Sequence, residues 1–131
     1  MKKTKPVHRF SLSATGTRRK VRVYVWANRE QMWDAVTRDG AKGRWGRATL
    51  VDMGSKYSNI HFSRGCLGTE VVAHESVHAA CWLMRNAPKI FRHKFRGDQA
   101  GARAIEEDIA FWAGQIQRGI VSELYRAGVY S

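Results

Sequence analysis

Residues 69–85 restrict the fold of this chain most, because an apolar run there carries two histidines four positions apart. The histidines are His74 and His78, and Glu75 follows the first of them. The neighbouring positions are apolar or small: Val71, Val72, Ala73, Val77, Ala79, Ala80 and Cys81. This run predicts a largely buried helix, capped by Thr69 and ending before Pro88. The rest of the chain must therefore supply partners for a helix that carries ionisable groups.

The spacing of the two histidines predicts a metal site. At 3.6 residues per turn, positions i and i+4 lie one above the other on a single helix face. Both imidazoles can therefore reach one Zn²⁺ at about 2.0–2.1 Å. Glu75 is rotated by one position, so it misses the metal but reaches a water beside it, as a general base would. The alternative is a helix that displays these residues by chance, and the apolar surroundings disfavour it because buried histidines need partners.

A catalytic zinc needs a third protein ligand and an open position. The sequence leaves several candidates, which are His61, His93 and the acidic triplet Glu106, Glu107 and Asp108. Tyr125 and Tyr130 are further candidates for stabilising an oxyanion, although nothing in the sequence places either near the motif.

The segment from His74 to Ala80, followed by the acidic triplet and Ile109-Ala110-Phe111, resembles the gluzincin-like HExxH metallopeptidases. Similar proteins include the ImmA/IrrE-like proteins and short zincin-like proteins of phages and prophages. The resemblance implies a third ligand from a second helix in an ExxA pattern, which is Glu107 with Ala110 three residues on. Glu106 is the alternative. Phe111 departs from the pattern, because relatives often carry Asp or Asn there.

The remaining pattern predicts an α+β fold. Residues 20–26 alternate Val with larger polar or aromatic residues and indicate a half-buried strand, which residues 10–13 can join across a turn at 15–17. A helix over 29–38 with Asn28 as its cap is followed by strands at 48–53 and 59–63, and a long helix covers 102–127. We expect an antiparallel or mixed sheet of three or four strands, packed on the motif helix and the long C-terminal helix. Residues 1–9 are expected to form a basic tail, and residues 10–131 a single zincin-like domain.

Charge and cysteine content restrict the partners. The formal net charge is +12 and the isoelectric point about 10.4, which favours non-specific attraction to nucleic acid. No apolar segment approaches the length of a membrane helix, and residues 1–10 are charged and lack the apolar run of a secretory signal. Two cysteines, Cys66 and Cys81, make no disulfide framework and favour a reducing cytoplasm. The resemblance to proteins of phages and prophages implies that this is the cytoplasm of a bacterial or phage-infected cell.

These patterns lead to one leading functional hypothesis and two alternatives. The first is a zinc-dependent metallopeptidase that hydrolyses a restricted protein target, with His74, His78 and Glu107 as ligands and Glu75 as general base on a zinc-activated water. Its substrate would add as a strand along residues 59–63, where His61 could assist. The second is an inactive zinc-binding module of the same fold, which would bind nucleic acid or a DNA-associated protein. The third is a basic nucleic-acid-binding protein with an incidental motif.

Overall fold

The computed structural model describes residues 4–14, 17–41, 46–87 and 99–129. Four strands form one mixed sheet in the order β1-β2-β4-β3. They are β1 (His8–Ser13), β2 (Lys20–Trp26), β3 (Ala48–Asp52) and β4 (Tyr57–Ser63). β2 and β4 are parallel, whereas β1 pairs with β2 and β3 pairs with β4 in antiparallel fashion. The predicted α+β class and the mixed sheet are confirmed.

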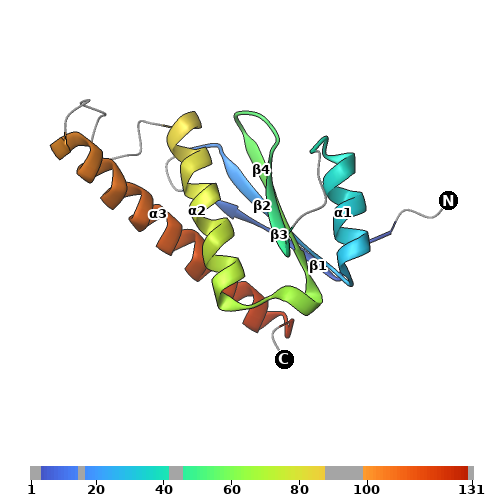
Figure 1. Ribbon diagram of the computed structural model, residues 1–131. Helices are drawn as coiled ribbons and strands as arrows, with labels where there is room; N and C mark the ends of the chain where they lie inside the picture. The colour runs from blue at the N-terminus through green and yellow to red at the C-terminus, as the bar shows by residue number, and fades with distance from the viewer. Residues whose placement is uncertain (1–3, 15–16, 42–45, 88–98, 130–131) are drawn as a thin grey trace.

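Helices cover both faces of this sheet (Figure 1). On one face lie α2 (Thr69–Asn86) and α3 (Gln99–Arg126), and on the other lies α1 (Arg29–Arg38). Alternate residues of β2 face the two helix layers. Val21, Val23 and Val25 point into the core shared with α2 and α3. Trp26, at the end of β2, joins Met32, Trp33 and Val36 of α1 in a second cluster. α2 and α3 therefore pack on the larger hydrophobic core, and α1 packs on the smaller one across the sheet.

α1 begins where the sequence predicts. The Asn28 side chain accepts a hydrogen bond from the Gln31 backbone N–H at 2.9 Å, which satisfies one of the free donors of the first turn. The helix ends at Arg38, and Asp39 caps it with a backbone N–H that still donates to the Ala35 carbonyl. Because α1 and β3 lie between β2 and β4 in sequence, the chain crosses over and returns with β4 parallel to β2.

The position of β4 corrects one prediction. Residues 59–63 were expected at the sheet edge, but β4 lies between β2 and β3, and the free edge on this side belongs to β3. A central strand is covered on both faces, which explains why six consecutive residues of β4, from Ser58 to Ser63, are buried. Any strand added beside the motif helix must therefore pair with β3.

Several boundaries also differ from the predictions, among them the start of β4, which begins at Tyr57, two residues before the predicted position. β1 begins at His8, so the last two residues of the expected tail belong to the sheet. Gly68, not Thr69, occupies the cap position of α2, and Thr69 is the first helical residue. α3 begins at Gln99, three residues before the predicted start. Within the described part of the chain, no helix is long and apolar enough to cross a membrane.

Candidate metal centre

An open groove of about 860 Å³ lies between the edge strand β3 and helix α2. Three contacts, spaced along the two elements, hold β3 and α2 side by side. Arg47 and Glu70 approach within 3.8 Å, the Leu50 backbone N–H donates to the Glu75 carboxylate, and Trp82 Nε1 donates to the Gly54 carbonyl at 3.0 Å. β3 and α2 therefore run in the same direction, and His74, Glu75 and His78 all line the groove.

The two histidines face each other across one turn of α2. Both are exposed, which corrects the expectation that they are buried. Their Nε2 atoms are 3.2 Å apart, and their rings meet edge to face with centroids 4.8 Å apart. Two nitrogens bound tetrahedrally at about 2.0–2.1 Å to one zinc ion would lie about 3.3 Å apart. Partial burial lowers the pKa of His78, and the neighbouring His74 and Arg85 lower it further. A neutral imidazole is the form that binds a metal.

Glu75 lies beside this pair with only 4% of its surface exposed. Burial raises the pKa of its carboxyl group, against the opposing effects of His74 and the hydrogen bond from Leu50. Its Oε2 atom is buried and has no hydrogen-bond partner among the described residues. One ligand atom from each of His74, Glu75 and His78 falls within 4.8 Å of the others. This donor set fits a divalent ion, because a cation and its water would satisfy the facing nitrogens and the unpartnered oxygen.

No known protein family, curated protein or solved structure matches the chain. What the structure shows is His74, Glu75 and His78 positioned as an HExxH-like motif in a groove beside a sheet edge.

The third ligand expected from α3 is not part of the described cluster. Glu107 and Glu106 are both exposed, and neither lines the groove. Glu106 precedes Ala113 by seven residues and Ile120 by fourteen, and both of these are buried. At 3.6 residues per turn it therefore shares their side of α3, whereas Glu107 is turned away from it. Asp108 is buried and already engaged in an interaction.

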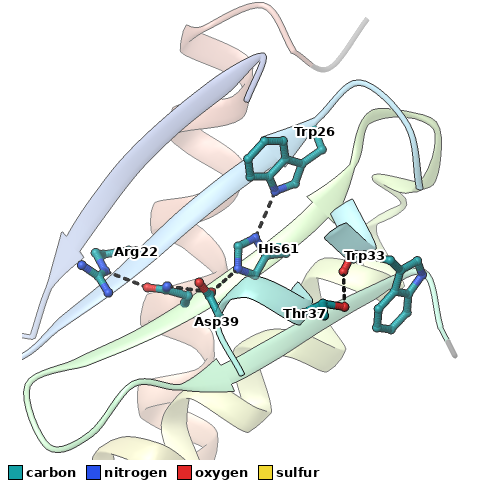
Figure 2. A network of polar contacts seen from close by, with 7 residues as sticks. Arg22, Trp26, Trp33, Thr37, Asp39 and His61 are labelled. Carbon is teal, nitrogen blue, oxygen red and sulfur yellow. Dashed lines mark hydrogen bonds and ion pairs between the residues drawn. The ribbon is translucent and has the colours of Figure 1, made fainter. Parts of the chain in front are cut away.

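His61 belongs to a different site. It lies on the α1 side of the sheet, where Trp26 Nε1 donates to its Nδ1 at 3.0 Å and its Nε2 lies 2.6 Å from Asp39 Oδ2 (Figure 2). Asn59 links Asp39 to Arg22 and extends the network. A substrate role for His61, the less favoured of its two interpretations, does not fit this geometry, because both ring nitrogens already have partners on the opposite face from the groove. His61 is a buried strand histidine, the interpretation that the sequence favours.

None of the other sequence candidates that the structure describes lines the groove. His93 and Tyr130 fall outside the described residues, and Tyr125 is 66% exposed near the end of α3. Cys66 and Cys81 are free and half-buried. Sequence reasoning missed the groove residues Leu50, Arg47 and Arg85, of which Leu50 acts through its backbone and leaves no signal in a side-chain motif.

Proposed function

We propose that this protein is a zinc-dependent metallopeptidase acting on a restricted protein or peptide target. The observation that carries the proposal is the 3.2 Å approach of the His74 and His78 Nε2 atoms beside a buried glutamate in a groove bordered by a free strand edge. A purely structural metal site has no need for an acid at the position of Glu75.

In this proposal, His74 and His78 hold the ion and Glu75 moves protons. A bound zinc ion supplies a Lewis acid that polarises the scissile carbonyl and makes a nearby water more acidic. Glu75 takes the proton from that water and passes it to the leaving amine. Its burial supports this role, because a carboxylate whose pKa is raised toward neutrality is a stronger base than an exposed one.

The free edge of β3 supports peptide binding. The Leu50 backbone N–H points toward Glu75 and therefore away from β4, so the polar groups of this residue face the groove. An extended peptide can add there as a further strand, because an unpaired edge offers main-chain donors and acceptors. The bond to be cleaved would then lie between β3 and the histidines of α2.

We propose that a carboxylate of α3 completes the ligand set. Glu107 is the residue that the motif resemblance favours, and Glu106 is the one that shares a side with buried residues of α3. Zinc analysis of purified Glu106→Ala and Glu107→Ala beside wild type separates them, because the variant lacking the ligand should retain at least tenfold less zinc. Full zinc content in both variants would exclude an α3 carboxylate.

The deciding experiment replaces the base and keeps the ligands. Glu75→Gln should bind about one zinc ion per chain and lose cleavage by at least a hundredfold, read by mass spectrometry on a library of host-cell peptides. Glu70→Gln is the matched control, since Glu70 lines the same groove on the same helix but is largely exposed. Cleavage at the wild-type rate by Glu75→Gln would overturn the peptidase assignment.

A zinc-binding module without catalysis is the second candidate. One observation favours it, since the described walls of the groove come only from α2, β3 and the two residues preceding β3. A groove with two walls holds a peptide less firmly than a closed cleft. Under this reading Glu75→Gln leaves zinc content and partner affinity unchanged, and no wild-type cleavage is detected. For either function we propose a cytoplasmic setting, which the two free cysteines favour, and the motif resemblance adds that the cell is bacterial or phage-infected.

A further inference from the structure

Two turns meet at the end of the sheet where β2 and β4 begin. Because these strands are parallel, the turn entering β2 and the turn entering β4 lie at the same end. The Lys20 backbone N–H donates to the Lys56 carbonyl at 2.9 Å and joins the two turns directly. Side chains that are distant in sequence are therefore brought together there.

Between these turns lies an open hollow of about 610 Å³, lined by Thr17, Arg18, Arg19, Ser55 and Lys56. We call these five residues the basic hollow. Three of them are cations, and none carries a carboxylate. Two carry hydroxyl groups, of which Thr17 Oγ1 already donates to the Ala14 carbonyl at 2.9 Å. Arg19 is half-buried, and its Nε atom has no acceptor among the described residues. No described carboxylate forms an ion pair with any of the three cations.

Several other described cations have partners within the protein. Arg47 pairs with Glu70, Arg126 with Glu123, and Arg22 donates to Asn59 and covers the Tyr57 ring. The basic hollow instead gathers three positive charges with no described counter-charge. Like charges held close together repel, and a bound anion would relieve that repulsion.

We propose that the basic hollow binds the phosphodiester backbone of nucleic acid. Guanidinium, ammonium and hydroxyl groups are the side chains that most often contact backbone phosphates. The hollow is open and wide, which suits a continuous polyanion better than a small free anion that needs an enclosing site. The net charge of +12 adds a long-range attraction of the same sign. The site is built from residues outside the metal groove, so it stands independently of the peptidase proposal.

The test compares two triple variants of equal charge change. Arg18→Gln/Arg19→Gln/Lys56→Gln removes the cations of the basic hollow. Lys5→Gln/Arg9→Gln/Arg64→Gln also removes two arginines and one lysine, all exposed. These flank the opposite end of the sheet, where β1 begins and β4 ends. Binding of a short fluorescein-labelled duplex DNA is followed by anisotropy across a series of salt concentrations, with and without a chelator.

The basic-hollow triple should bind DNA at least tenfold more weakly than the control triple, and its log–log salt slope should fall by about two to three. Equal losses in the two triples, or no wild-type binding at low salt, would overturn the proposal. So would tighter binding of poly-glutamate than of DNA, or saturation of the site by inorganic phosphate without DNA binding. Because Arg19 is half-buried, Arg18→Gln/Lys56→Gln against Lys5→Gln/Arg9→Gln repeats the comparison with exposed residues only.

Discussion

The carboxyl group of Glu75 lies in a buried position that disfavours its charged form. The carboxyl group is buried, its pKa is raised by that burial, and Oε2 has no hydrogen-bond partner among the described residues. A buried group of this kind costs stability that is recovered only when a ligand arrives.

The first prediction follows for the protein without metal. Glu75→Gln should stabilise it by about 1 kcal/mol, because the amide removes the charge and keeps an acceptor for the Leu50 N–H. Urea unfolding in the presence of a chelator measures this difference. Exposed Glu70→Gln should change stability by less than about 0.5 kcal/mol. A destabilised Glu75→Gln variant would mean that the ionised carboxylate is satisfied in the fold.

His61 is held in one neutral tautomer. Its Nδ1 accepts the Trp26 indole N–H, so the ring proton is on Nε2 and is donated to Asp39. Protonation would require Nδ1 to give up that acceptor role. Burial lowers the pKa of His61 below 6.5, against the raising effect of Asp39.

The second prediction concerns pH. Because the folded state binds a proton less readily than the unfolded one, the stability from His61 is complete above pH 6.5 and is lost as the pH falls toward the lowered pKa. Trp26→Phe frees Nδ1 to bind a proton next to Asp39, so its free energy of unfolding should depend less on pH over this range. Denaturant titrations at a series of pH values from neutral to mildly acidic measure both slopes. Identical slopes in the two proteins would contradict the assigned tautomer.

At the scale of the elements, two glycines of α3 give opposite expectations. Gly114 has open space around it, whereas a Cβ on Gly119 would lie 3.0 Å from the Leu12 side chain of β1. Alanine favours a helix interior over glycine by about 0.5–1 kcal/mol.

The third prediction is that Gly114→Ala raises the thermal midpoint and that Gly119→Ala fails to, or lowers it, because Leu12 must move. The two variants share the same helix and the same chemical change, so each serves as the control for the other. Equal increases would show that α3 does not press against β1 at Gly119.

Most elements could be predicted from the sequence because their signals are local. Alternation defined β2, the Asn28 cap defined α1, and the i, i+4 histidines defined the face of α2. Strand order could not be predicted, because it depends on how the chain crosses over between β2 and β4. Residues 59–63 were expected at the edge because they directly precede the motif helix in sequence. The polar side chains of Asn59 and His61 are instead buried by a network whose partners lie elsewhere in the chain.

In the candidate site, too, some features follow from local sequence and others depend on the tertiary structure. His74, Glu75 and His78 lie on one helical turn, so their spacing alone brought them together. Leu50 and the groove depend on β3 reaching α2, which no local pattern encodes. The contribution of α3 depends on the rotation of that helix about its axis, and a shift of one residue exchanges Glu106 for Glu107.

At the scale of the whole molecule, a metal ion should add to stability. The fourth prediction is that excess zinc raises the free energy of unfolding by about 2.7 kcal/mol when its concentration is a hundred times the dissociation constant. His74→Ala should abolish the increase, and a chelator should reverse it in the wild type. Thermal scans with and without zinc make the measurement, and an equal zinc effect in His74→Ala would place the ion elsewhere.

The turn between β3 and β4 connects two surfaces that were described separately. Asp52 lines the groove, the Gly54 carbonyl holds Trp82 of α2, and Ser55 and Lys56 line the basic hollow. Gly54 adopts φ +104°, a backbone conformation that few other residues accept. Because this one turn borders both the groove and the basic hollow, an insertion in it would change the distance between a ligand in the groove and a ligand in the basic hollow.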